Sequence, residues 1–444
     1  MLKRELDPLI IMKTQNKSKN IAWVAKEGLC TGCGTCTALC PRGAIRMVID
    51  EKQGIYLPVI DAALCNDCGI CLKVCPGHEV DFVKLNEFAF DTQPADLLLG
   101  HYIACYTGHA TDQEIRYNCS SGGLVTAMLI HMLESGEIDG ALVTRMRKDR
   151  PLEPEPFIAR TREEIYEARG SKYCPVPANV ALKEILEKPG RYAVVGLPCH
   201  MHGLRKAEMI NSTLRERVVM RLGLVCSHEF NFVGTKATLK KQGIKTDDVN
   251  EIKYRGEGWP GSMKVGLQNG ETALIPYDHY ILPHQLYFYS IKRCLLCVDF
   301  IGRFSDATLM DAWLPDIIGN DNNGTSLLIV RTNKCHAWLV QAVRQNGMKL
   351  FQIRATQVLH SQGGARLKNS YFRAHSRIMK FFNSRVPAYG VIAPQSRLIH
   401  YLRVVVMGMN YFISRNNYIR WLIGPAIALE RRFFNAAKAS LKSI

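Results

Sequence analysis

A cysteine pattern that occurs twice near the start of the chain limits its fold more than any other feature of the sequence. Between Cys30 and Pro76 the run C-x2-C-x2-C-x3-C-P appears two times and takes up eight of the sixteen cysteines. In such a run the first three thiolates bind one iron-sulfur cubane, and the fourth reaches the other cubane. The spacing therefore predicts two [4Fe-4S] clusters with crossed ligands, one held by Cys30, Cys33, Cys36 and Cys75 and the other by Cys65, Cys68, Cys71 and Cys40.

Zinc sites and disulfide frameworks are the alternatives, and neither explains a third thiol that always follows two residues after the second. This part of the chain resembles bacterial two-cluster ferredoxins. Cluster ligands must be reduced thiolates, which favours a reducing cytoplasm over a secreted location. The first residues contain no apolar run long enough for a signal peptide.

The length of 444 residues is too great for one core and indicates several domains. We expect a flexible leader over 1–22, an α+β two-cluster ferredoxin domain over 23–90, an α/β domain over 98–360 and a basic helical extension over 385–444. Within the ferredoxin domain, the segment from Ile21 to Ala25 is expected to form a strand. Residues 44–49 and 54–60 are expected to form a hairpin.

In the α/β part, a Ser-Ser-Gly-Gly turn precedes a predicted helix from Leu124 to Glu134. Such a turn exposes backbone amides at the positive end of the helix, where a phosphate or a ring carbonyl can bind. An ordinary serine N-cap is the simpler alternative. Further on, Lys172 and Tyr173 follow a predicted helix over 162–168, where they either contact a nucleotide or belong to a surface loop.

A second group of thiols lies at predicted strand ends. The strand over 192–196 runs into Cys199, and the strand over 218–225 ends at Cys226. Ligands gather at the carboxyl ends of strands in open α/β sheets, so these thiols can share a site with Cys294 and Cys297. A cluster, a zinc ion and unliganded thiols all remain compatible with this set. No general acid is assigned; the candidates, by proximity alone, are His200, His202, His228 and Asp299.

Taken in order, these motifs resemble the beta subunits of deazaflavin-reducing (factor 420) hydrogenases and dehydrogenases. Plant 7-hydroxymethyl chlorophyll reductase and cyanobacterial divinyl chlorophyllide reductase are relatives of that family. The resemblance runs from about residue 25 to about residue 360. It implies an FAD in the α/β domain beside a third [4Fe-4S] cluster on Cys199, Cys226, Cys294 and Cys297. The segments that contact the flavin in the family correspond to Ser121, Gly122, Gly123, Lys172 and Tyr173.

The charge of the chain is strongly positive, with a formal net charge of +17. No nucleic-acid-binding motif accompanies it, so an acidic electron carrier such as ferredoxin is the favoured partner. After an expected loop over 360–366, residues 385–444 hold nine Lys or Arg and one acid, Glu430. Two apolar segments there, 398–413 and 418–429, are too short to span a membrane. They either lie on an anionic membrane surface at the inner face, dock on a partner or pack on the protein's own core.

Together these features predict a cytoplasmic iron-sulfur flavoprotein oxidoreductase. Electrons would pass from a ferredoxin-like donor through the clusters to FAD, and then to a small organic substrate or the deazaflavin coenzyme. One alternative is an electron-transfer subunit whose larger partner holds the active site. The other is a scaffold with zinc in the second thiol group.

Overall fold

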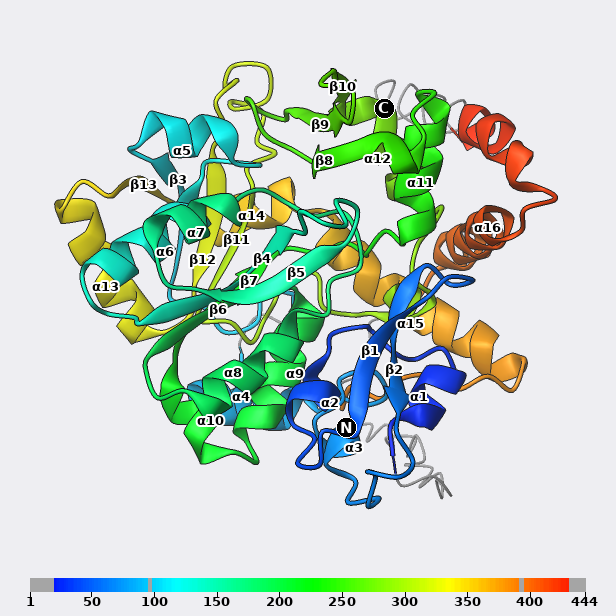
Figure 1. The fold of residues 1–444 in the computed structure, drawn as a ribbon, viewed down its shortest axis with the longest axis horizontal. Coiled ribbons are helices and arrows are strands. Elements are labelled where there is room, and N and C mark those ends of the chain that lie inside the picture. Colours follow the sequence, from blue (N-terminus) through cyan, green and yellow to red (C-terminus); the bar gives the residue numbers. More distant parts are fainter. Residues whose placement is uncertain (1–19, 95–97, 391–394, 431–444) are drawn as a thin grey trace, which may run out of the picture.

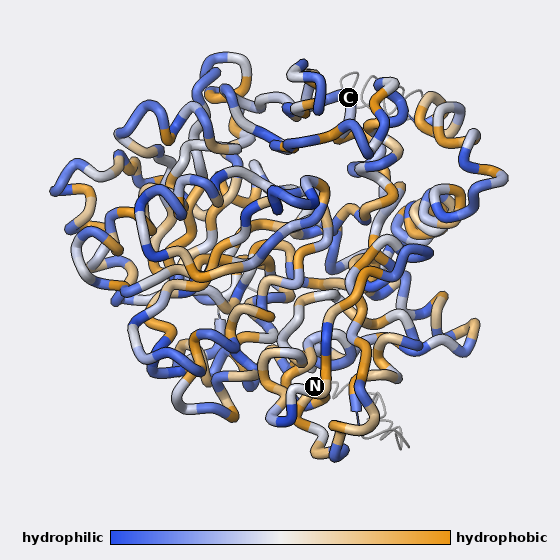
Figure 2. Tube along the Cα trace, viewed as in Figure 1, coloured by the Kyte–Doolittle hydropathy of each residue, from blue (hydrophilic) through white to orange (hydrophobic). Residues whose placement is uncertain are grey.

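The computed structural model describes residues 20–94, 98–390 and 395–430 of the chain. An eight-stranded sheet forms its centre, with helices on both faces, and the N-terminal cysteine unit lies against one side (Figure 1). Apolar residues lie along the central strands and also along the helical segment at the right-hand edge of the view (Figure 2). Most of the expected leader and the end of the basic extension fall outside the described residues.

The N-terminal unit has the expected hairpin, in which Ile45 pairs with Ile60 and Asp50 with Ile55. The strand expected from Ile21 to Ala25 is wrong, because these residues begin a helix whose Val24 is fully buried. The elements of the unit are α1 (Ala22–Lys26), α2 (Thr35–Ala38), β1 (Ile45–Asp50), β2 (Ile55–Ile60), α3 (Ile70–Lys73) and α4 (Phe82–Phe90).

The large sheet has the strand order β13-β3-β12-β11-β7-β6-β4-β5. Its inner strands β4, β6, β7 and β11 run parallel to one another. Each strand outside them pairs antiparallel with its neighbour. The carboxyl ends of the parallel strands therefore lie at one edge. The strands are β3 (Ala104–Ala110), β4 (Gly140–Met146), β5 (Pro154–Ala159), β6 (Tyr192–Gly196), β7 (Val218–Leu224), β11 (Ala307–Asp311), β12 (Ser326–Val330) and β13 (Met348–Ile353).

Helices cover both faces of this sheet, which confirms the α/β class. On one face α6 (Leu124–Glu134), α7 (Arg162–Glu167) and α13 (Asn333–Arg344) pack on the strands, and α5 (Gln113–Asn118) lies beside them. On the other face lie η1 (Ala178–Ala181), α8 (Leu182–Glu187), α9 (Pro198–Glu208) and α10 (Ser212–Arg217). The apolar side chains of the strands are therefore buried in two layers.

A smaller antiparallel sheet was not foreseen from the sequence. It has the order β10-β9-β8 and packs with two helices on the loop that carries Tyr173. Its elements are α11 (Phe232–Lys241), η2 (Thr246–Asp248), β8 (Val249–Lys253), β9 (Ser262–Leu267), β10 (Thr272–Pro276) and α12 (Tyr277–Gln285), and η3 (Lys292–Leu296) follows. Arg255, which follows β8, and helix α12, which follows β10, line the site described below.

Long helices make up much of the described chain after residue 354. The loop expected over 360–366 is wrong: α14 (Ala355–Ser361) and α15 (Gly364–Phe381) leave only two residues between them. Helix α15 crosses to the N-terminal unit, where Phe372 and Met379 join its core. Helix α16 (Leu398–Arg415) packs on α15, and η4 (Arg420–Leu422) follows it. No helix in the described ranges is both long and apolar enough to cross a membrane.

Candidate functional site

The eight N-terminal thiols gather in the crossed arrangement that the spacing predicts. Cys75 lies close enough to Cys30 and Cys36 to raise the pKa of both thiols, in addition to the larger effect of burial. The second set comes together around a cavity of about 20 Å³ that is lined by Cys40, Cys65, Cys68 and Cys71. All sixteen cysteines of the chain are free thiols.

Two left-handed glycines shape the cysteine loops. Gly34 and Gly69 follow the second cysteine of each run with φ of 83° and 74°, which only glycine adopts without strain, and each begins a short helix. Backbone amides then point at sulfur: Gly32 N donates to Cys30 Sγ at 3.3 Å and Gly77 N to Cys75 Sγ at 3.2 Å. Such bonds stabilise the negative charge of a cluster and tune its potential.

The N-terminal unit is joined to the α/β domain through polar contacts beside the clusters. Asn179 N donates to the Cys33 carbonyl at 2.9 Å, and its side chain donates to Thr35 Oγ1 and the His200 carbonyl. From the other side, Arg293 Nε donates to the Gly77 carbonyl at 2.6 Å. These contacts are buried, so they hold the N-terminal thiols around Cys30 against the second thiol group, which consists of Cys199, Cys226, Cys294 and Cys297.

The second thiol group forms at the carboxyl edge of the parallel strands. Cys199 follows β6 at the start of α9, Cys226 follows β7, and Cys294 and Cys297 come from η3 and the residue after it. Burial raises the pKa of the Cys199 thiol, and the nearby Glu229, Cys33, Cys226 and Cys294 raise it further. Cys199 therefore lies close to Cys33 of the N-terminal unit as well as to its own group. In the described part of the chain, no three His, Cys, Asp or Glu side chains are arranged to hold one metal ion.

A buried lysine lies near three of these thiols, those of Cys226, Cys294 and Cys297. Lys368 Nζ, from α15, donates to the carbonyls of Cys226 at 3.0 Å and Asp299 at 3.1 Å. Burial opposes its charge, yet the surrounding thiols, above all that of Cys297, raise the pKa of Lys368. Burial also raises the pKa of the Cys226 thiol. Iron in place of the thiol protons would give the lysine its counter-charge.

A buried set of four charges fixes the elements that carry the thiols. Arg205 donates to Glu208 at 3.1 Å and to Asp306 at 3.3 Å, and Arg221 contacts the same two acids at 2.8 and 3.3 Å. The four residues belong to α9, β7 and the turn before β11. Because a buried charge without its partner is costly, this set locks the two cysteine-bearing strand ends together.

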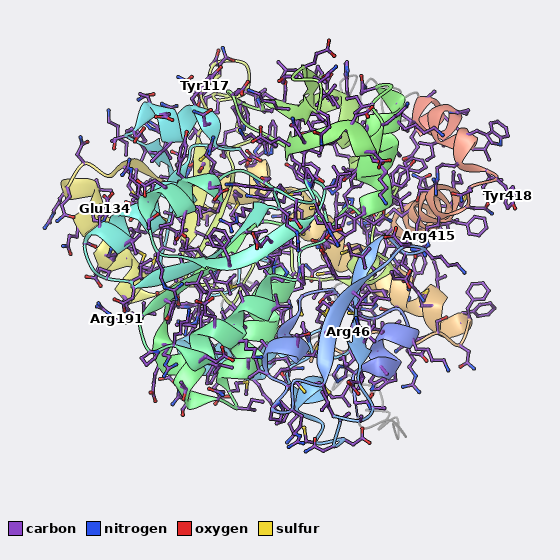
Figure 3. All side chains as sticks on the ribbon, in the orientation of Figure 1. Arg46, Tyr117, Glu134, Arg191, Arg415 and Tyr418 are labelled. Atoms are coloured by element: carbon purple, nitrogen blue, oxygen red, sulfur yellow. The ribbon has the colours of Figure 1, made fainter. Side chains whose placement is uncertain are left out.

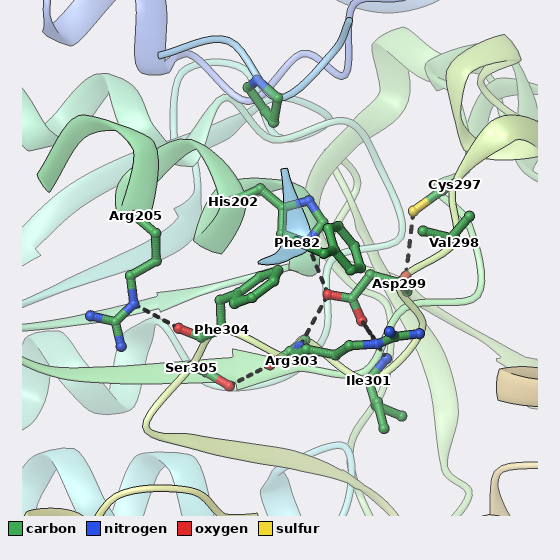
Figure 4. A network of polar contacts seen from close by, with 12 residues as sticks. Phe82, His202, Arg205, Cys297, Val298, Asp299, Ile301, Arg303, Phe304 and Ser305 are labelled. Atoms are coloured by element: carbon green, nitrogen blue, oxygen red, sulfur yellow. Dashed lines mark hydrogen bonds and ion pairs between the residues drawn. The ribbon is translucent and has the colours of Figure 1, made fainter. Parts of the chain in front are cut away.

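Asp299 organises the loop after Cys297 (Figure 4). Its carboxylate accepts hydrogen bonds from His202 Nε2 at 2.9 Å, from Ile301 N at 3.2 Å and from Arg303 N at 3.0 Å. Although burial favours the neutral acid, the bond from His202 holds the pKa of Asp299 below its usual range. Both His202 and Asp299, named as acid candidates from the sequence, therefore serve to position this loop.

A cavity of about 680 Å³ opens directly beside the second thiol group and reaches the start of α6. Cys226 lines it, as do Ser121, Gly123, Lys172 and Tyr173 from the segments predicted to contact a flavin. Helix α6 begins at Gly123 with φ of 74° and without a side-chain cap, so its first amides are free of the serine N-cap considered above. The volume is typical of a cofactor site, and the amides suit an anionic group.

In two residues of the predicted flavin segments, Gly122 and Lys172, the polar groups are already hydrogen-bonded within the protein. Gly122 does not line the cavity: its N–H donates to Ser326 Oγ at 2.9 Å, and a Cβ there would lie 2.6 Å from the Gly108 carbonyl. Lys172 lines the cavity, but its ammonium donates to three carbonyls at the end of α7, among them that of Arg169 at 3.0 Å. Burial lowers the pKa of Lys172 to about 8.

Two of the acid candidates line the cavity and are neutral imidazoles. His200 Nδ1 accepts from Leu197 N at 3.0 Å and Nε2 donates to the Val176 carbonyl, and burial lowers the pKa of His200 to about 4. His228 Nε2 donates to the His284 carbonyl at 2.6 Å, while its buried Nδ1 has no partner among the described residues.

The far wall of the cavity contains residues that the sequence did not indicate. Arg255 is buried and donates twice to Asp311, at 2.8 and 3.1 Å, and Trp259 Nε1 donates to Asp311 at 2.9 Å. Asp311 ends β11 at the same sheet edge as the cysteines, and Trp313 follows it. Position at a strand end was the available signal for Asp311, whereas Arg255 lies in a segment with no motif.

Comparison with known proteins agrees with this arrangement. Residues 29–78 match the model of a 4Fe-4S dicluster domain. Residues 105–183 and 190–356 match the N-terminal and C-terminal models of the coenzyme F420 hydrogenase/dehydrogenase beta subunit. The coenzyme F420 hydrogenase subunit beta of Methanococcus voltae is 30% identical over 254 residues, which are 55% of this chain and 82% of that protein. The chain belongs to the F420 hydrogenase/dehydrogenase beta subunit family. Helices α15 and α16 lie beyond the matched residues.

Other members of the family show the same relationship. The F420 hydrogenase subunit beta of Methanosarcina barkeri is 29% identical and covers 53% of this chain and 77% of its own length. The F420-dependent sulfite reductase of Methanocaldococcus jannaschii is 26% identical over 70% of this chain and 45% of that protein. A chain in the structure of the F420-reducing [NiFe] hydrogenase complex of Methanosarcina barkeri has the same fold, with a TM-score of 0.51 and 24% identity over 67% of this chain and 98% of that one.

Proposed function

We propose that the chain is the electron-transfer subunit of a larger cytoplasmic oxidoreductase. Its clusters would carry single electrons between a partner and an FAD in the large cavity. The substrate at the flavin would be the deazaflavin coenzyme or another small organic molecule. The names of the related hydrogenase and dehydrogenase subunits support a larger catalytic partner over a free-standing reductase.

The observation that carries this proposal is the unbroken order of the candidate sites. The Cys71 thiol lies near that of Cys36, and the Cys33 thiol lies near that of Cys199. Cys226 belongs to the second thiol group and lines the cavity. A flavin supplies the step between two-electron chemistry at an organic ring and one-electron chemistry at a cluster. A cluster on Cys226 would therefore lie next to the cavity.

The residues of the chain would supply position and charge at each stage. The amides at the start of α6 would hold the anionic part of the cofactor, and Asn179 with Arg293 would keep the first clusters in contact with the third. The fixed pair of Arg255 and Asp311 would shape the substrate side of the cavity. The net charge of +17 on the whole chain favours an acidic electron carrier or subunit as the partner.

The test is electron transfer through the anaerobically purified chain, with a reduced viologen as donor and coenzyme F420 as acceptor. Wild-type protein should reduce the coenzyme, and Cys226→Ala should lose at least 90% of the rate while retaining the N-terminal clusters. Cys335→Ala is the matched control, because Cys335 is buried in α13 and belongs to neither thiol group. Equal rates in both variants would contradict the proposed path.

The second question is whether the chain works alone. Expression with its genomic neighbours and affinity purification should give a complex that contains a larger catalytic subunit. Turnover of a small substrate by the isolated chain, with reduced ferredoxin as donor and no other subunit, would support the free-standing reductase instead.

A further inference from the structure

Helix α16 has its polar side chains turned toward the protein. Asn410 Nδ2 donates to the Leu286 carbonyl at 2.8 Å, and Ser414 Oγ accepts from Tyr289 N at 2.9 Å. Arg403, on the same helix, pairs with Glu430 at 2.6 Å in a largely buried contact. A surface helix normally places such residues in solvent. The polar groups on the inward face of α16 therefore have their hydrogen-bond and ion-pair partners within the protein.

The opposite face of α16 is apolar and open. Its residues recur every three or four positions, so they form one stripe along the helix. Their side chains stay 51 to 75% exposed, although the helix is well packed on its other side. The stripe consists of Leu398, Leu402, Val405, Met409 and Phe412. Monomeric soluble proteins rarely leave a contiguous apolar surface of this kind without a function.

Aromatic and cationic residues border this stripe. Tyr418 and Trp421, just after the helix, are 90% and 71% exposed. Arg397, Arg415 and Arg420 lie at the two ends of α16, and none of them forms an ion pair in the described ranges. The one acid of the extension, Glu430, is already paired. Tyrosine, tryptophan and arginine beside apolar side chains are typical of the boundary between lipid headgroups and acyl chains.

Helix α16 lies at the edge of the molecule, where a flat surface can contact it. Helix α16 and the residues after it form the right-hand edge of the molecule, and Tyr418 projects there (Figures 1 and 3). The stripe lies between Arg397 at one end of the helix and Arg415 and Arg420 at the other. No helix of the described chain is able to cross a bilayer. A helix that lies in the plane of the surface needs no such length.

We propose that the outer face of α16, with Tyr418 and Trp421, binds the surface of an anionic lipid membrane. The apolar stripe would enter the headgroup boundary, while the arginines would contact the negative headgroups. This proposal does not depend on any bound cofactor or on the electron path. It would hold the redox chain at a membrane while leaving the N-terminal clusters open to a carrier.

The test is flotation of the full chain with vesicles of phosphatidylcholine alone or with added phosphatidylglycerol. The protein should float with the anionic vesicles at least tenfold better than with the neutral ones. About 0.5 M salt should release much of it, because salt screens exposed charges. Recovery of the protein at the bottom of the gradient with both lipids would overturn the proposal.

Matched variants distinguish vesicle binding by the stripe from non-specific binding by any exposed apolar residue. The double variant Met409→Ser and Phe412→Ser should weaken vesicle binding at least tenfold. The control is Leu274→Ser and Phe351→Ser, which removes residues of equal exposure, 58% and 59%, from other surfaces and should leave binding unchanged. If the stripe variant instead turns a wild-type dimer or complex into a monomer and vesicles bind neither form, the face is a protein interface and the proposal is wrong.

Discussion

The charge of Lys368 should set the potential of the third cluster. Lys368 is 8% exposed, and its ammonium lies 3.0 Å from the carbonyl oxygen of Cys226. Reduction adds negative charge to a cluster, so a neighbouring cation favours the reduced state. Replacement by methionine keeps the length of the side chain and removes the charge. We expect Lys368→Met to lower the midpoint potential of this cluster.

The magnitude follows from Coulomb's law. With about 7 Å between the ammonium and the cluster and an effective dielectric constant of about 20, the interaction is about 2.4 kcal/mol. For a one-electron couple this corresponds to a shift of about 100 mV. Water that enters the space of the lost ammonium would reduce the shift, so a measured value of about 50–100 mV downward is expected.

An anaerobic redox titration followed by electron paramagnetic resonance measures the midpoints of the three clusters separately. One midpoint should fall and the other two should stay within about 20 mV, because the thiols that act on Lys368 are those of Cys297, Cys226 and Cys294 and none from the N-terminal sets. Lys368→Arg keeps the charge and should restore the wild-type value. Unchanged iron content together with an unshifted midpoint in Lys368→Met would refute the electrostatic role.

Two further substitutions test how the thiol-bearing elements are held. Glu208→Gln removes one of the two acids that the buried Arg205 and Arg221 share and should cost about 3–5 kcal/mol in urea unfolding. The exposed pair of Glu187 serves as control, and Glu187→Gln should cost under about 0.5 kcal/mol. Gly203→Ala would bring a Cβ to 2.2 Å from Thr35 Oγ1 and should loosen the N-terminal unit by about 1–3 kcal/mol, seen as faster proteolysis between the domains. Gly408→Ala, where nothing lies within 4 Å, should leave proteolysis unchanged.

The parts of the fold that were predictable depend on local pattern. The helix expected from Leu124 to Glu134 and the strand over 192–196 have the predicted bounds, because each combines a clear apolar period with a turn. The gathering of Cys199 and Cys226 also followed from sequence, since two parallel strands must end at the same edge.

The parts that were missed depend on contacts between distant residues. Lys368 reaches the thiols from a helix that begins after a Gly-Gly pair, and that pair read as a loop because glycine usually ends helices. Gly364 is required there by the Phe300 ring, which would lie 2.7 Å from a Cβ. Arg255 and the small sheet around it had no motif, and only the folded chain brings them to Asp311.

The most direct test of the account is the cofactor content of one anaerobic preparation, with iron, sulfide, zinc and flavin measured on the same sample. The account predicts about twelve irons, four per cubane, and one FAD per chain, and about eight irons in Cys226→Ala. About eight irons in the wild-type chain, with stoichiometric zinc and no flavin, would contradict the third cluster and the electron path to the cavity.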